Sequence, residues 1–180
     1  MERKRKAGAP LRVSIALSML AAISIVCGKY LAINAGEFMR FSFENLPIIF
    51  AGIAFGPLAA AAVGVTADLV GCLLVGFAIN PLVTVGAGAV GFISGTVWHL
   101  LTELRPTVRL TLTLFAAHAV GSVVIKGIGL SAFYSIPLDA LMLWRLLNYL
   151  VVGIAEGILL FFLIKSRMVT DAVRKIKRGE

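Results

Sequence analysis

The sequence predicts an all-α membrane protein with six transmembrane helices and both termini on the cytoplasmic side. Composition and charge lead to this prediction. Of the 180 residues, 59% are hydrophobic and only 14% are charged, about half the charged share of a soluble domain. The mean hydropathy is +0.97, and at about 20 residues a span the chain has room for five or six helices.

Basic residues gather at the two ends of the chain and set the expected topology. Five of the 17 lysines and arginines precede the first apolar run, and six follow the last one. Because cytoplasmic segments are enriched in lysine and arginine, both ends are expected inside, which requires an even number of spans. We expect the basic ends to contact anionic membrane lipid, and the net charge of +8 is not a nucleic-acid signal here.

The first half of the chain is expected to hold three helices. The first covers residues 11–33, and we expect it to be retained because no A-x-A-like cleavage site follows its apolar run. The second is short and covers residues 46–55. The third covers residues 57–77 and begins at Pro57, a first-turn position that suits proline because the N–H lost there has no helical partner.

The second half is expected to hold three more helices and a basic tail that carries a surface helix on lipid. The fourth helix begins near Pro81 and ends before the charged residues 103–106. With these helices, 13 of the 17 basic residues lie inside, and residues 1–180 form a single integral membrane domain. The expected ranges in this half are 81–102, 107–128, 137–164 and the cytoplasmic tail 165–180.

Residues 40–71 carry polar groups that are costly in so apolar a chain, so a binding site is the first hypothesis for some of them. Arg40 precedes the second helix, and its guanidinium suits a carboxylate or the edge of a heterocycle. It could instead anchor the chain at lipid head groups. Phe41 and Phe43 could hold an aromatic ring between them, or could belong to an interfacial aromatic belt.

Further candidates lie on the later helices. Asp68 sits near the middle of the third helix and must be neutral or partnered, either with N–H groups of a ligand or within the protein. Its possible protein partners are Lys126, Arg145 and His118. Lys126 and Arg145 could together hold an anionic ligand, although a local salt bridge competes for Arg145. Tyr134, in the expected loop between the last two helices, could cover the pocket or be a plain interfacial tyrosine.

Other polar groups have simpler explanations. His99 and His118 lie on different helices without a third metal ligand at a suitable spacing, so we expect hydrogen bonds between helices and no metal or cofactor. Cys27 and Cys72 fall in apolar runs and are expected to be small buried residues. Glu156 lies deep in the last helix, where it could face a water-filled crevice or a partner protein, or be protonated.

Short motifs follow one another in an informative order. The chain contains R-x-S-F-x-x-L-P, then F-G-P and D-L-x-G, followed by three further segments; the six begin at Arg40, Phe55, Asp68, Lys126, Phe133 and Arg145. In this order they resemble the S component, the substrate-binding membrane subunit, of energy-coupling factor (ECF) vitamin transporters, most closely its folate-type branch. Glu44 departs from the pattern, which has a small or apolar residue there. The ligand therefore stays open between folate or a related pterin and another vitamin or nucleobase-like molecule.

The resemblance implies a protein of the bacterial plasma membrane that binds one vitamin from outside and hydrolyses no ATP. It would dock on a transmembrane coupling protein that carries two ATPase subunits, and tilt to deliver its cargo. Members dock through a small-x-x-x-small pair on the first helix, here Ser18-x-x-x-Ala22 with Ala21 beside it. We expect the pocket to lie under the loops joining helices 1–2, 3–4 and 5–6. Its expected ligand-binding residues are Arg40, Phe41, Phe43, Asp68, Lys126, Tyr134 and Arg145.

Two other classes of protein are alternatives. A small membrane enzyme acting on lipid could use Asp68, Glu156, His99 and His118, but the chain has neither H-E-x-x-H nor G-x-S-x-G. A pore or purely structural subunit is disfavoured because too few helix faces are polar. A self-contained ATPase is excluded, since no phosphate-binding G-x-x-x-x-G-K-[ST] loop is present.

Overall fold

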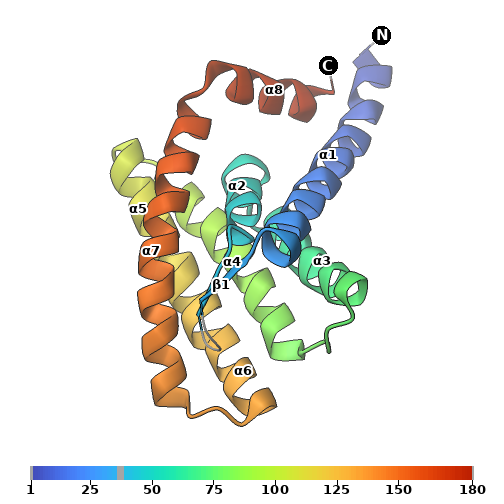
Figure 1. The fold of residues 1–180 in the computed structure, drawn as a ribbon. Coiled ribbons are helices and arrows are strands. Elements are labelled where there is room, and N and C mark those ends of the chain that lie inside the picture. The colour runs from blue at the N-terminus through green and yellow to red at the C-terminus, as the bar shows by residue number, and fades with distance from the viewer. Residues whose placement is uncertain (1, 36–38, 180) are drawn as a thin grey trace.

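The structure is a computed structural model that describes residues 2–35 and 39–179, with the side chains of residues 10–33 and 41–179. It is a bundle of helices arranged around α4 (Pro81–Leu100), which is central because it contacts helices from both halves of the chain (Figure 1). The helices that contact α4 are α2 (Asn45–Phe55), α3 (Pro57–Val75), α5 (Pro106–Ala116), the π-helical η2 (Ala117–Ile125) and α6 (Lys126–Tyr134).

Three further helices complete the bundle. α1 (Glu2–Ile25) packs on α2 and α3 and continues into a π-helical turn, η1 (Val26–Tyr30). α7 (Leu138–Lys165) packs on α5, η2 and α6, and α8 (Arg167–Arg178) crosses one end of the bundle to reach α1. The two chain ends therefore lie at the same end of the molecule (Figure 1). This arrangement suits the cytoplasmic location expected for both, which stays a prediction.

The all-α membrane class is confirmed. Within the described residues, five helical segments are long and apolar enough to cross a membrane: Pro10–Tyr30, Pro57–Val75, Pro81–Leu100, Pro106–Tyr134 and Leu138–Lys165. α2 has only 11 residues. At 1.5 Å a residue it reaches about 16 Å, roughly half the hydrocarbon thickness of a membrane. Most of α2 is buried by its neighbours, so its apolar side chains form core and not lipid surface.

The fifth predicted helix is longer than expected. It runs through η2 and α6 as far as Tyr134, so the prediction that Tyr134 lies in a loop is wrong. Gly129 weakens a helix in isolation, but here it lets α6 approach the first turn of α4, where Leu82 leaves no room for a Cβ. The helix stops at Ser135, which has a φ of 55°, two residues before Pro137.

The connection between α1 and α2 contains a β-hairpin that the sequence analysis did not predict. β1 (Ile33–Ala35) pairs antiparallel with β2 (Met39–Phe41), and Ile33 stands opposite Phe41. Three residues in each strand are too few to show a periodic pattern in the sequence. β2 contacts α7. The hairpin therefore follows the first helix in the chain and packs against the last membrane-spanning helix.

Glycines allow the closest helix approaches in the bundle. A Cβ at Gly64 on α3 would clash with the backbone carbonyl of Ala87 on α4, and a Cβ at Gly91 would clash with the carbonyl of Ala60. The two backbones therefore touch directly, as expected of small residues at a membrane helix interface. Gly56 has a different role: its φ of 97° makes the turn from α2 into α3, a conformation that side-chain-bearing residues rarely adopt.

Candidate ligand-binding site

Four charged side chains line a small cavity where η1, the loop between β2 and α2, α3 and α6 meet. They are Lys29, Glu44, Asp68 and Lys126, which carry two positive and two negative charges. The cavity has a volume of about 10 Å³, roughly the space of one water molecule. The uncharged lining residues are Ser24, Ile25, Gly28, Ile48, Gly64, Ala67 and Ala87.

Lys126 and Glu44 form an ion pair within this cavity. The Nζ atom of Lys126 lies 2.7 Å from Oε1 of Glu44, although the two residues are 82 positions apart in the chain. The lysine side chain is 5% exposed and that of the glutamate 24% exposed. Glu44 is the residue that departs from the family pattern. Its position against Lys126 shows that the departure lies inside the candidate site.

Asp68 has a different partner from those expected. Its Oδ2 atom accepts a hydrogen bond of 2.7 Å from the hydroxyl of Thr84 on α4, and the Cys72 thiol lies 4.0 Å from Oδ1. The Nζ atom of Lys29 lies 3.5 Å from the same sulfur. A carboxylate has about four acceptor positions, so these contacts leave Asp68 capacity to bind further N–H groups.

The three possible basic partners of Asp68 contact other groups. Lys126 pairs with Glu44, and His118 pairs with Glu156. Arg145 on α7 donates from Nε to the backbone carbonyl of Ser122 at 2.8 Å. Arg145 therefore holds α7 to η2, and a joint role of Lys126 and Arg145 in holding an anionic ligand stays a prediction.

The other expected ligand-binding residues lie on the hairpin, in the loop that follows it and at the end of α6. Arg40 pairs with Asn34 through the backbone, and its side chain lies outside the described residues. Phe41 is half-buried at the end of β2, whereas Phe43 is 41% exposed. Tyr134 is 57% exposed and packs edge-on against Phe133. None of these aromatic rings lines the small cavity.

A buried polar chain continues from the cavity into the bundle. Asn45, next to Glu44, donates to the hydroxyl of Ser122 at 3.3 Å. That hydroxyl lies 3.5 Å from Nδ1 of His118, whose Nε2 lies 2.7 Å from Oε2 of Glu156. The hydrogen bond between helices expected for His118 is present. His99 instead contacts the carbonyl of Gly95 on its own helix.

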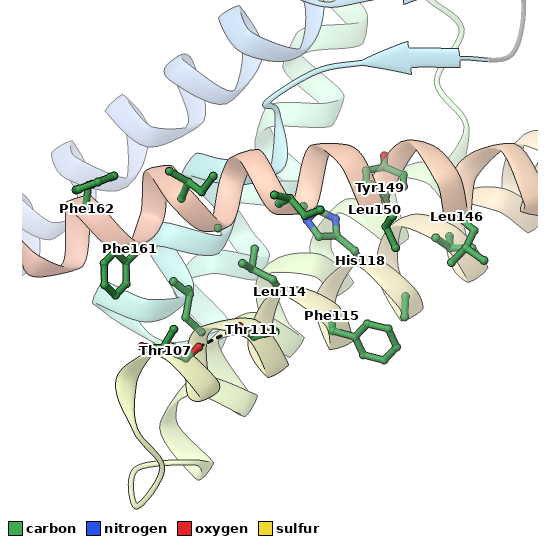
Figure 2. Close-up of a pocket in the computed structure, with 17 residues that line it drawn as sticks. Thr107, Thr111, Leu114, Phe115, His118, Leu146, Tyr149, Leu150, Phe161 and Phe162 are labelled. Atoms are coloured by element: carbon green, nitrogen blue, oxygen red, sulfur yellow. Dashed lines mark hydrogen bonds between the residues drawn. The ribbon is translucent and has the colours of Figure 1, made fainter.

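A groove of about 740 Å³ lies between α5–η2 and α7 (Figure 2). None of the seven expected ligand-binding residues lines it. Both walls are candidate membrane spans and their lining is almost wholly apolar, so in a membrane this groove faces lipid chains. The charged cavity is the candidate ligand site, because ionisable groups inside a membrane protein are retained for function or pairing.

Comparison with known proteins agrees with the geometry. The family described as ECF transporter, substrate-specific component, matches residues 12–166. The chain belongs to this family. It is therefore the substrate-binding membrane subunit of an ECF vitamin transporter and not an enzyme, which excludes the lipid-modifying alternative. Its partners are a small-molecule vitamin, a transmembrane coupling protein and two ATPase subunits, and it is a multi-pass protein of the cell membrane.

Solved structures match this S component over most of its length. A crystal structure of FolT bound with folic acid has 26% sequence identity and a TM-score of 0.69, covering 83% of this chain and 91% of that one. An S component of a bacterial ECF transporter has 17% identity and a TM-score of 0.66, covering 87% and 95%, and supports the fold alone. A search of curated proteins found no match.

Two residues at the S component's cavity were not predicted from the sequence: Lys29 lines it, and Thr84 binds Asp68. Lys29, which was not among the expected ligand-binding residues, lines the cavity with Asp68. Thr84 holds Asp68 from the neighbouring helix. A lysine at the end of an apolar helix, just before a loop, was the available signal for Lys29. Nothing in the sequence marked Thr84, because its role depends on which helix face meets Asp68.

The expected docking residues of the S component divide between two faces of α1. Ser18 and Ala22 are exposed, so they are available to a partner helix. Ala21 is 6% exposed and belongs to the hydrophobic core of the bundle. The exposed pair is therefore the part of the predicted docking motif that a coupling protein can reach.

Proposed function

We propose that this S component binds folate or a related pterin from the outer side of the membrane. The observation that carries the proposal is the charged cavity in which the carboxylates of Glu44 and Asp68 meet the ammonium groups of Lys29 and Lys126. A pterin ring presents neighbouring N–H donors on one edge, and a carboxylate accepts two such bonds side by side. The similarity to FolT bound with folic acid supports the same ligand class.

In this proposal Asp68 binds the ring edge at the floor of the site, since Thr84 already fixes its orientation. Phe41, Phe43 and Tyr134 are at least partly exposed and would cover the ring, and Arg40 would bind a carboxylate or the edge of the ring. The cavity of about 10 Å³ is smaller than any vitamin, so binding requires the cavity to widen. Transport then depends on docking through Ser18 and Ala22 to a coupling protein with its ATPases.

Isothermal titration of the purified protein in detergent tests the ligand. Folate and an uncharged pterin should bind saturably, and riboflavin, thiamine, biotin and adenine should not. Asp68→Asn should weaken pterin binding by roughly tenfold or more, a loss of about 1.4 kcal/mol. Glu103→Gln, in the exposed α4–α5 loop, is the matched control and should bind like the unaltered protein.

A clear signal for another vitamin or for a nucleobase, with no folate or pterin binding, would reject the folate assignment. It would leave the chain an S component with a different cargo. If the Asp68→Asn and Glu103→Gln variants bind the pterin with equal affinity, Asp68 does not bind the ligand.

A further inference from the structure

The position of Glu44 bears on what kind of chemical group can reach Lys126. Lys126 is 4% exposed, and its ammonium is covered by the Glu44 carboxylate at 2.7 Å. A buried ammonium requires a counter-charge, and here the protein provides one from its own loop. A ligand carboxylate at Lys126 would have to displace Glu44 or lie beside it.

Glu44 is held in this position from two sides. Its backbone carbonyl accepts a hydrogen bond of 2.6 Å from the hydroxyl of Ser24 on α1. Its side chain lies over Gly28, where an added Cβ would come within 2.8 Å of the Glu44 Cβ and 2.9 Å of Oε2. Gly28 therefore leaves the space that this carboxylate occupies. The contact is built by residues of η1, α1 and α6 together.

The charge balance of the cavity follows from this contact. Lys29 and Lys126 are matched by Glu44 and Asp68, so the site has no net formal charge. A second carboxylate close to Glu44 would meet like-charge repulsion, which is strong where water is excluded. An N–H-rich ring would meet two carboxylates that accept its hydrogen bonds.

We propose that Glu44 sets the substrate selectivity of this S component by acting as the counter-ion of Lys126. The part of the ligand that enters the cavity is then an uncharged, N–H-rich ring such as an aminopyrimidine edge, and any carboxylate of the ligand stays outside. This inference rests on the proposed function, in which the ligand is a pterin, and it specifies which portion of that ligand the charged cavity accepts.

The test compares two ligands that share one ring, folate with its carboxylates and 6-methylpterin without them. Their dissociation constants are measured for the unaltered protein and for Glu44→Gln. Removing the glutamate charge leaves Lys126 uncompensated. The affinity for folate relative to 6-methylpterin should then rise at least about tenfold in Glu44→Gln.

Two further variants separate charge from shape and from misfolding. Glu44→Asp keeps the charge and should keep the ligand preference of the unaltered protein. The double variant Glu44→Gln with Lys126→Gln removes both charges and should lose the gain in folate preference, as a double-mutant cycle requires of a coupled pair. Gel filtration and thermal unfolding confirm that each variant is folded before binding is measured.

The selectivity proposal is overturned if Glu44→Gln weakens both ligands by the same factor, or if Glu44→Asp changes the preference as much as Glu44→Gln does. Failure of the proposed function looks different: neither folate nor 6-methylpterin binds the unaltered protein while another vitamin does. In that case the same comparison is made with biotin and biotinamide, or with pantothenate and pantothenol, according to the vitamin bound. An unchanged preference in Glu44→Gln for that pair also overturns the role of Glu44.

Discussion

The Nε2 atom of His118 lies 2.7 Å from Oε2 of Glu156 and so joins η2 to α7 inside the bundle. Glu156 is fully buried and His118 is 5% exposed. The ring of Tyr149 stacks on the imidazole with 5.0 Å between the ring centroids. Water cannot replace either partner at this depth, so the pair is a fixed link between the last spanning helix and the rest of the protein.

Glu156→Ala should lower the free energy of unfolding by about 1–3 kcal/mol, because it leaves the buried imidazole without its partner. Glu156→Gln should cost less, since the amide can still hydrogen-bond the ring. Thermal unfolding of the purified variants in detergent measures both effects. Glu103→Ala, in an exposed loop, is the control, and an Ala variant at Glu156 no less stable than this control would contradict the link.

Gly64→Val should destabilise the bundle by about 1–3 kcal/mol, because the new side chain would push the α3 backbone away from the carbonyl of Ala87. The matched control is Gly153→Ala on α7, where an added Cβ would lie 3.6 Å from Cδ2 of His118, an ordinary contact. Unfolding temperatures of the two variants give the comparison. Equal unfolding temperatures of the two variants would mean that α3 and α4 can move apart without loss of stability.

Asn80 has two roles that two substitutions can separate. Its Oδ1 accepts from the backbone N–H groups of Leu82 and Val83 at the start of α4, and its Nδ2 donates to the carbonyl of Gly129 on α6 at 2.7 Å. Asn80→Ser keeps a helix-capping oxygen and loses the donor to α6. Asn80→Ala loses both and should be less stable than Asn80→Ser by about 1 kcal/mol. If the two variants are equally stable in denaturant titrations, the cap contributes nothing measurable to the free energy of unfolding.

Ser18→Leu and Ala22→Leu should block docking while sparing ligand binding, since both positions are exposed on α1 and a larger side chain keeps a partner helix away. Uptake into liposomes with the complete ECF module should fall by roughly tenfold or more, a docking loss of at least about 1.4 kcal/mol. Leu73→Met, at a position 69% exposed on α3, is the control. Normal uptake by both leucine variants would place the docking face elsewhere.

Transport should require the coupling protein and its ATPases, because the chain contains no nucleotide-binding loop. Liposomes that hold this chain alone should retain ligand bound to the protein but should accumulate none when ATP is enclosed. Liposomes with the full module serve as the positive control. ATP-dependent accumulation by the chain alone would contradict this prediction.

The tail shows how much of the fold could be read directly from local sequence. Val169, Val173 and Ile176 recur at helical spacing, and in α8 these three are half-buried while the basic residues between them are exposed. The turn at Gly56 and the proline-led start of α3 follow from equally local rules. The β-hairpin and the continuation of the fifth predicted helix to Tyr134 were not predicted, because they depend on neighbours that lie far away in the chain.

The candidate site was predictable only in part. Asp68 and Lys126 were found because a charge in an apolar helix is conspicuous, but their partners, Thr84 and Glu44, were not. The pairing of Lys126 with Glu44 joins residues 82 positions apart, and no periodic pattern links them. Ala21 looks like its neighbour Ala22 in sequence, yet it belongs to the core.

By itself the sequence determined the membrane class, the approximate helices and the family, because these depend on composition, on helical periodicity and on the order of short motifs. The tertiary structure alone decided which charges neutralise one another and which face of each helix is covered. The physical reason is that a buried charge is stabilised by whatever group lies within a few ångströms, and distances between groups remote in the chain are set only when the helices pack.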